Sequence, residues 1–343
     1  MKRIRFMLSY PLCMDKGGGV TQSFEALKAL EKLGYDVKPF DWYNEDIDFD
    51  ILFIFGFTHF NPEVLEFLKS KGVKIICEPI FVRVKNYLYY KVLGNILFRL
   101  PFQNFLNTKK RILELCDYIF VNSEVERNEI ANIFGISRDK IEVAYLGLPS
   151  YILENEDKVS EDLFYSKYKV RDFVFYPSAR ISVRKNQLSL VKALKGSGVK
   201  LVLTGCNDIE PELKEEFHKL VDGDNDILCL PVLDKETLIS AYKNSKVLAF
   251  ISLAETAGIV GLEGGYFGNN LVLSDIPVFK EYYDGYGSYV KPFDIVGIRK
   301  AIMDSLSRPR DYSIKDFILK NRTWEVHARL IDQTLERLYK NYV

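Results

Sequence analysis

Phe250-Ile-Ser-Leu-Ala-Glu-Thr-Ala-Gly-Ile-Val-Gly-Leu-Glu-Gly-Gly265 has the pattern of a buried strand-to-helix junction in an α/β fold. It begins as an apolar run typical of a buried strand and ends that run at Glu255, and the helical pattern that follows carries Glu263. Acidic side chains are costly on apolar surfaces unless they have partners or a function. Because ligands bind at the carboxyl ends of strands in open α/β sheets, this junction is the first candidate for a site.

The composition is that of a globular chain with a substantial core. Hydrophobic residues make up 48% and charged residues 27% of the 343 positions, a length that suits two domains. Basic and acidic residues both number 47, so the net charge gives no reason to expect nucleic acid as a partner. No apolar run approaches the ~20 residues of a membrane-spanning helix, and the N-terminal run is too short for a signal peptide.

The cysteines and histidines predict neither a disulfide framework nor a metal centre. The five cysteines are odd in number, share no CxxC spacing and have apolar neighbours, so we expect reduced core thiols in a cytoplasmic protein. They are Cys13, Cys77, Cys116, Cys206 and Cys229. With only three histidines, His59, His218 and His327, a His-rich metal site is excluded and no metal is predicted.

Short apolar runs alternate with helical patterns in two blocks, which predicts parallel strands joined by helices. The predicted strands are residues 3–9, 50–56, 73–77 and 117–122, then 172–177, 200–205, 227–231, 247–252 and 270–274. Helices are predicted at 21–33, 186–195, 210–221, 234–244 and 258–268. The polar stretch 149–170 is interpreted as the linker region. We therefore predict an α/β fold of two doubly wound domains that face each other across a cleft.

Two other strand ends carry residues suited to phosphate. Gly17, Gly18 and Gly19 precede a helix, whose N-terminus offers N–H groups and a positive dipole end, but a merely flexible turn is an equally good interpretation. The spacing is not the GxGxxG dinucleotide fingerprint. Arg180 and Lys185 follow the first strand of the second block, where cations suit a diphosphate but are also common in solvated loops.

Each glutamate of the opening stretch has an ordinary structural explanation as well. Glu255 would serve as a cap, and Glu263 would stabilise the positive end of the helix. The backbone N–H groups of Gly258 and Ile259 are placed to hold an anion at that helix start. Two acids, two cations and a glycine loop on matching strand ends together favour a ligand site, with Glu255 exposed to the cleft and Glu263 pointing back toward it.

The ordered set of motifs resembles the retaining glycosyltransferase family 4 of the GT-B fold, the glycosyl transferases group 1. The diphosphate-binding pair of that family matches Arg180 and Lys185, and its E-x7-E motif matches Glu255 and Glu263. Further matching segments are residues 18–20, 33–37, 117–123, 134–136, 140–143, 146–147, 274–277, 281, 287 and 324–325. The resemblance implies an acceptor-binding domain at 1–160, a donor-binding domain at 161–320 and a terminal helix at 321–343 that packs back on the first domain.

The resemblance also implies an activity. The protein would be a hexosyltransferase that moves a sugar, with retention, from a UDP- or GDP-sugar to a glycan, lipid-linked or other hydroxyl acceptor, with no metal and no cofactor. The implied catalytic residues are Glu255, Arg180, Lys185 and Glu78. The implied donor-binding residues are Gly18, Gly19, Arg180, Lys185, Val232, Glu255, Gly258, Ile259 and Glu263. Glu255 would contact the donor sugar, Glu263 the ribose, and the two cations the diphosphate.

One departure from the family pattern leaves alternatives open. Many members have a histidine at the end of a central strand of the first domain, where Glu78 stands here; either Glu78 or His59 would take its place. A sugar-nucleotide epimerase of the same fold and a degenerate, non-catalytic sugar-nucleotide-binding subunit are the alternative functions.

The segment 79–113 is locally basic despite the balanced total charge. It lacks acidic residues and interleaves seven Lys and Arg side chains with aromatic ones. The pattern is typical of binding to an anionic membrane surface, which would place the protein on the inner face of the membrane. Helices that pack their aromatic side chains inward explain it equally well.

Overall fold

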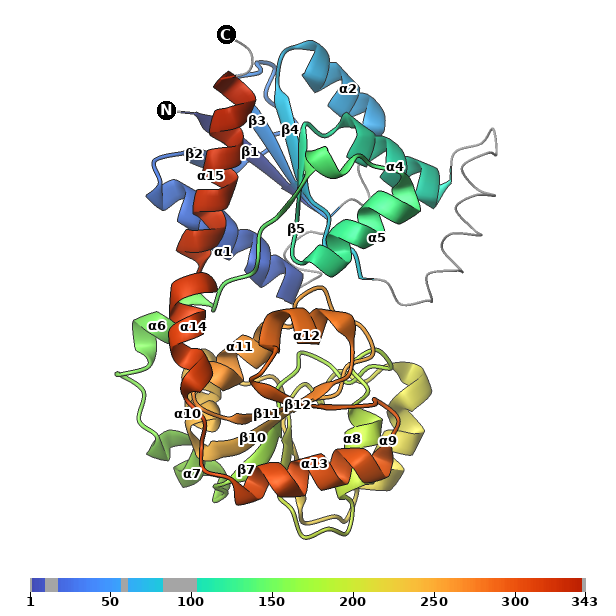
Figure 1. The fold of residues 1–343 in the computed structure, drawn as a ribbon, viewed down its shortest axis with the longest axis vertical. Coiled ribbons are helices and arrows are strands. Elements are labelled where there is room, and N and C mark those ends of the chain that lie inside the picture. The colour runs from blue at the N-terminus through green and yellow to red at the C-terminus, as the bar shows by residue number, and fades with distance from the viewer. Residues whose placement is uncertain (1, 10–17, 57–60, 83–103, 341–343) are drawn as a thin grey trace. The chain divides into compact units, whose positions relative to one another are not determined.

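The computed structural model describes residues 2–9, 18–56, 61–82 and 104–340, and the chain divides into two compact units. Unit 1 comprises Met1–Leu146 and Trp324–Val343, and unit 2 comprises Gly147–Thr323. Each unit contains one six-stranded parallel sheet with helices (Figure 1). The predicted α/β fold of two doubly wound domains is confirmed.

Unit 1 is built on the sheet order β2-β1-β3-β4-β5-β6. Its strands are β1 (Arg3–Leu8), β2 (Asp36–Pro39), β3 (Ile51–Phe55), β4 (Lys74–Glu78), β5 (Tyr118–Val121) and β6 (Ile141–Val143). Its helices are α1 (Gly18–Lys32), α2 (Pro62–Ser70), α4 (Phe105–Leu115), α5 (Glu124–Phe134) and α15 (Trp324–Lys340), with a 3-10 turn at Arg138–Lys140. Every residue of β3 is buried, as expected for a central parallel strand covered on both faces.

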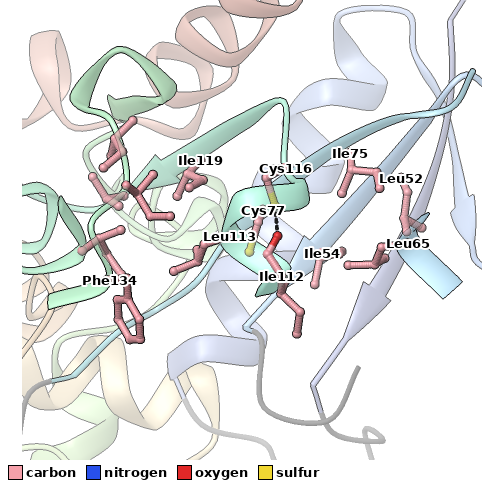
Figure 2. Packing of buried hydrophobic residues seen from close by; sticks show 14 of the residues in the cluster. Leu52, Ile54, Leu65, Ile75, Cys77, Ile112, Leu113, Cys116, Ile119 and Phe134 are labelled. Atoms are coloured by element: carbon pink, nitrogen blue, oxygen red, sulfur yellow. Dashed lines mark hydrogen bonds between the residues drawn. The ribbon is translucent and has the colours of Figure 1, made fainter. Parts of the chain in front are cut away.

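One hydrophobic cluster of unit 1 lies between the central strands and the helices on one face of the sheet (Figure 2). Leu52 and Ile54 of β3 pack with Ile75 of β4, and α4 contributes Ile112 and Leu113. Ile112 and Leu113 share the buried side of α4 with Leu106, whereas Arg111 and Glu114 are exposed, so the amphipathic pattern sets which face is buried. No helix among the described residues is long and apolar enough to cross a membrane.

Helix α15 belongs to unit 1 and packs against α1 (Figure 1). Its apolar stripe of Ala328, Ile331 and Leu335 is fully buried. The hydroxyl of Tyr35 donates to Asp332 Oδ1 over 2.6 Å, which adds a directional contact to the apolar one.

Unit 2 has the sheet order β12-β11-β10-β7-β8-β9. Its strands are β7 (Phe173–Tyr176), β8 (Leu201–Leu203), β9 (Ile227–Cys229), β10 (Ser245–Phe250), β11 (Asn270–Ser274) and β12 (Gly287–Val290). Its helices are α6 (Ser150–Asn155), α7 (Asp162–Tyr168), α8 (Gln187–Leu194), α9 (Lys214–Val221), α10 (Lys235–Asn244), α11 (Ile259–Tyr266), α12 (Pro277–Tyr283), α13 (Ile295–Ser307) and α14 (Ser313–Asn321), with a 3-10 turn at Pro211–Leu213. The strand order reverses between β7 and β10, so the carboxyl ends of these two strands mark the expected ligand crevice.

The polar stretch 149–170 belongs to unit 2, so the division between the units falls earlier than the predicted residue 160. The stretch forms α6 and α7, whose acidic side chains face outward while Phe164 is fully buried. Its backbone is held by α10, where Lys243 Nζ donates to Val159 O over 2.9 Å and Ser240 Oγ donates to Glu161 O over 2.8 Å. A charged surface on two short helices therefore explains the lapse in the apolar pattern.

Candidate functional site

The loop that leaves β7 is held rigidly at the carboxyl edge of the unit 2 sheet. The hydroxyl of Tyr176, the last residue of β7, donates to Lys185 O over 2.5 Å. Asn186 adopts a left-handed backbone with φ of 56°, and its buried amide donates to Ile251 O (3.1 Å) and Pro292 O (2.7 Å). These bonds tie the loop to the end of β10, so Lys185 has a defined position.

Glu255 lies in the loop that follows β10 and is paired with two cations of the loop that follows β7. Its Oε1 lies 2.7 Å from Lys185 Nζ and 3.0 Å from Arg184 Nη1. Only 9% of the Glu255 side chain is exposed, so the prediction of an open carboxylate at the strand tip is wrong. Arg184 also donates to Ala254 O over 3.0 Å, and the sequence reasoning missed it, although the run Arg180, Arg184, Lys185 signals a cationic loop.

The electrostatics of this triad keep the carboxylate charged. Burial would raise the pKa of Glu255, but Lys185 and Arg184 outweigh burial and hold that pKa below its ordinary value. Burial lowers the pKa of Lys185 in spite of Glu255. Two cations on one carboxylate leave a net positive charge at the switch point of the sheet, which suits an anionic ligand.

Glu263, on α11, makes different contacts. Its side chain is 7% exposed and accepts hydrogen bonds from Tyr242, on α10, and from Tyr151, on α6, the latter over 3.3 Å. Burial raises the pKa of Glu263, and the two tyrosine hydroxyls oppose that rise. The two tyrosines are contacts that no motif in the sequence indicates, because they come from segments far from the E-x7-E stretch.

Gly258, the residue before α11, has a conformation and surroundings that require glycine. Its φ is +83°, and a Cβ there would lie 2.6 Å from Phe279 Cε1 and 2.9 Å from Phe250 Cε1. Its carbonyl accepts from Tyr283 Oη over 2.5 Å. The positive end of α11, beginning at Ile259, is thus fixed a few residues beyond Glu255.

Arg180 is not part of the Glu255 cluster. It is half exposed and its Nη2 lies 3.3 Å from Asp208 Oδ1, in the loop after β8. The same loop holds Asn207, whose Oδ1 accepts from the backbone N–H of Val232 over 3.3 Å. Arg180 and Val232 are therefore linked through the loop after β8, separately from the pair formed by Glu255 and Lys185.

The predicted residues of unit 1 are placed as follows. Gly18 and Gly19 open α1, so the helix begins three residues earlier than predicted, and Gly17 lies outside the described residues. Glu78 ends β4 and is fully buried, and burial raises its pKa to about 8. Neither of its oxygens has a hydrogen-bond partner among the described residues, and a substrate hydroxyl could reach them only after they became accessible. His59 and residues 83–103 of the basic segment lie outside the described part.

No cluster of three His, Cys, Asp or Glu side chains that could hold a metal ion occurs in the described ranges. The groups with chemistry at the carboxyl edge of unit 2 are therefore cations, carboxylates and tyrosine hydroxyls. They can bind an anion, accept hydrogen bonds from hydroxyl groups and stabilise developing negative charge.

Comparison with known proteins gives the class of this domain. Residues 161–324 match the family model described as "Glycosyl transferases group 1". An uncharacterized glycosyltransferase of Methanocaldococcus jannaschii, MJ1607, is 24% identical over 233 residues, which cover 63% of this chain and 56% of the relative. The match thus spans little more than half of that relative's length.

Solved structures resemble the whole chain. The glycosyltransferase from Rickettsia africae ESF-5 superposes with a TM-score of 0.75 at 14% identity and covers 99% of both chains. Anabaena Alr3699/HepE, solved in complex with UDP, gives a TM-score of 0.70 at 14% identity and covers 98% of this chain and 100% of that one. The protein has the GT-B fold. Its residues 161–324 form a glycosyl transferases group 1 domain.

Proposed function

We propose that this protein is a retaining glycosyltransferase of the family 4 type, which transfers a hexose from a nucleotide-diphosphate sugar to a hydroxyl group of its acceptor. The observation that carries the proposal is the pairing of Glu255 with Lys185 and Arg184 at the switch point of the unit 2 sheet. The relative from Anabaena, of the same fold, was solved with UDP and with UDP-glucose.

The cluster at Glu255 is suited to exchange partners when a donor binds. A diphosphate attracts Lys185 because it carries more negative charge than one carboxylate, and the Glu255 oxygens then become available to the hydroxyls of the sugar. As the bond to the sugar breaks, charge builds on the leaving diphosphate and Lys185 stabilises it, with Arg180 as the second cation. The diphosphate itself would help to deprotonate the acceptor, so no metal is needed.

With the diphosphate at Lys185 and the sugar at Glu255, the remaining parts of the donor would meet other residues of unit 2. Glu263 would accept hydrogen bonds from the ribose, which compete with those from Tyr151 and Tyr242. The backbone at Val232, half exposed beside Asn207, would contact the base, and the start of α11 at Gly258 and Ile259 would bind phosphate. Gly18 and Gly19 belong to unit 1, and their part in phosphate binding stays a prediction of the sequence, as does that of Glu78 in proton transfer.

Nucleotide binding tests the proposal directly. Purified protein is heated with UDP, GDP or ADP; a ligand that binds only the folded state raises the melting temperature, and a tighter ligand at the same concentration raises it more. Hydrolysis of UDP- and GDP-sugars by the same protein then reports turnover. Stabilisation by one nucleotide together with slow hydrolysis of its sugar is expected, and no response to any nucleotide would contradict the proposal.

The same assays separate the alternatives. Tight nucleotide binding without turnover of any donor or acceptor would indicate a non-catalytic binding subunit, and interconversion of the free sugar nucleotide would indicate an epimerase. We place the reaction in the cytoplasm, with a glycan or a lipid-linked compound as acceptor. Sedimentation with anionic and neutral vesicles tests the membrane contact predicted for residues 79–113: binding to anionic vesicles that salt weakens is expected, and no binding at low salt would exclude it.

A further inference from the structure

Two cysteines of unit 2 meet on neighbouring strands, outside the Glu255 cluster. Cys229 is the last residue of β9, and its register partner on β8 is Leu203. Cys206 follows β8 by three residues, and its Sγ lies 3.8 Å from the carbonyl oxygen of the same Leu203. The backbone N–H of Cys206 donates to Leu230 O over 3.0 Å, and that of Leu230 donates to Leu203 O over 2.9 Å. The sheet therefore brings the backbones of the two cysteines together.

The thiols interact with each other and with solvent. A hydrogen bond between them raises the pKa of Cys206 and lowers the pKa of Cys229, so Cys229 is the better thiolate. Both residues are partly exposed, whereas most cysteines of a globular core are fully buried. A small oxidant in solution can thus reach a pair of sulfur atoms that are already neighbours.

We propose that Cys206 and Cys229 are a redox-active dithiol that closes to an intramolecular disulfide on reaction with a low-molecular-weight disulfide such as oxidised glutathione. The thiolate of Cys229 attacks one sulfur of oxidised glutathione, forms a mixed disulfide and releases one glutathione thiolate. The Cys206 thiol then loses its proton to solvent, attacks Cys229 Sγ and releases the second glutathione. The protein loses two electrons and two protons, and one glutathione disulfide becomes two thiols.

The disulfide would act on the loop after β8, which contacts the predicted donor residues Arg180 and Val232, a consequence that rests on the proposed function. Gly205 precedes Cys206 with φ of +77°, and a Cβ there would lie 2.6 Å from the backbone of Ala179 and Arg180. Asn207 and Asp208 follow, one bonded to the backbone of Val232 and the other paired with Arg180. A disulfide at Cys206 therefore restrains the loop that contacts Arg180 and Val232, the residues proposed to bind the diphosphate and the base. We expect the affinity for nucleotide to change severalfold.

Unit 1 supplies a matched internal control. Cys77 and Cys116 also lie close together (Figure 2). Burial is the main cause that raises the pKa of Cys77, and a hydrogen bond with Cys116 adds to it. Both are fully buried among apolar side chains, with Cys116 Sγ 3.2 Å from Ile112 O. Because an oxidant in solution does not reach these two buried thiols, we expect Cys77 and Cys116 to stay reduced although they are close together.

Peptide mapping of the oxidised protein tests the proposal. The reduced full chain is treated with oxidised glutathione, remaining thiols are alkylated under denaturing conditions, and the chain is digested with trypsin without reductant. Lys214 and Lys219 lie between the two cysteines, so a disulfide joins two separate peptides. We expect this linked pair, lost in Cys206→Ser and in Cys229→Ser, while the peptides of Cys77 and Cys116 are recovered alkylated.

The other outcomes are equally informative. Alkylated Cys206 and Cys229, a mixed disulfide that never resolves, or a bond that joins either residue to Cys13 instead would each overturn the dithiol. A second experiment measures how much UDP or GDP raises the melting temperature of the wild-type protein, once in its oxidised and once in its reduced form. If neither form responds to nucleotide while the linked peptides appear, the proposed function fails and the dithiol stands; equal responses of both forms would overturn its coupling to the donor loops.

Discussion

The Nε2 atom of His327 lies 3.7 Å from Oε1 of Glu78, and both side chains are fully buried inside unit 1. Burial raises the pKa of Glu78 to about 8, with Glu126 adding to the rise and Gln22 opposing it. Burial lowers the pKa of His327 to about 4, although the backbone at Tyr145 and Ala144 favours the charged form. The two groups are thus both uncharged near neutral pH, and 3.7 Å is too long for a hydrogen bond between them.

Glu78→Gln should stabilise the protein at alkaline pH. The folded-state pKa of Glu78 is about 8 and its ordinary value is 4.5, so the stability tied to its protonated form is complete below 4.5 and is lost as pH rises to about 8. A neutral amide does not titrate, so the variant should melt higher than wild type by on the order of 5 °C near pH 8 and gain nothing below about pH 5. Melting curves recorded across this pH range test the prediction. Glu31→Gln, a substitution at an exposed glutamate, is the control. A shift independent of pH would contradict the assignment.

His327→Gln should make the melting temperature less dependent on pH below neutrality. The folded-state pKa of His327 is about 4 and its ordinary value is 6.5, so the stability of the neutral imidazole is present above 6.5 and is lost as pH falls through 4. The variant loses the ring contact with Trp324 and should melt lower than wild type at pH 7, but its melting temperature should fall less between pH 6.5 and 4. Parallel curves for the two proteins would show that His327 does not titrate there.

Lys185→Ala should abolish most donor use. The substitution removes the cation nearest to Glu255 and leaves only Arg184 to balance that carboxylate, so the diphosphate loses a charge-assisted hydrogen bond and meets a less positive site. We expect nucleotide-sugar turnover to fall by about 100-fold or more, as for the loss of one group that stabilises developing charge. Lys192→Ala, which removes an exposed lysine paired with Glu216 on α9, is the matched control. Full activity in Lys185→Ala would refute the site.

Glu263→Ala should weaken nucleotide binding and cost some stability. It removes the ribose contact proposed above and the carboxylate that accepts the hydrogen bond of the buried Tyr242 hydroxyl, at a cost of about 1–3 kcal/mol. Tyr242→Phe removes one of the same hydrogen bonds and keeps the carboxylate, so it should lower the free energy of unfolding but keep nucleotide binding. Equal nucleotide affinity in Glu263→Ala and Tyr242→Phe, measured by calorimetry, would remove the ribose role.

Gly258→Ala should destabilise unit 2 by about 2–4 kcal/mol, through overpacking and a positive φ together. The added Cβ meets the rings of Phe279 and Phe250. Gly285→Ala is the control, because its φ of +79° is similar but nothing lies within 4 Å of the added Cβ. Chemical denaturation of both variants gives their free energies of unfolding and separates the effect of the clash from that of backbone strain. Equal losses of stability would show that the rings of Phe279 and Phe250 move aside without an energetic penalty.

The sequence predicted the central strands well because parallel strands that are buried on both faces are continuous apolar runs. Residues 51–55 and 173–176 lie within the predicted runs 50–56 and 172–177. The strands β2, β6 and β12 were not predicted, and all three stand at sheet edges. Edge strands are short and partly exposed, as the pattern of β2 shows, so their sequences lack the signal on which a strand prediction depends.

Local patterns in the sequence were sufficient to predict the two α/β units and to select Glu255, Lys185 and Glu263 as candidates. These depend on local periodicity and on motifs, which are properties of neighbouring residues. Which side chains meet is visible only in the folded chain: Glu255 pairs with Arg184 as well as Lys185, Arg180 pairs with Asp208, and Glu78 lies beside His327. Charge and burial at a side chain depend on segments far away in the chain, and only folding brings them together.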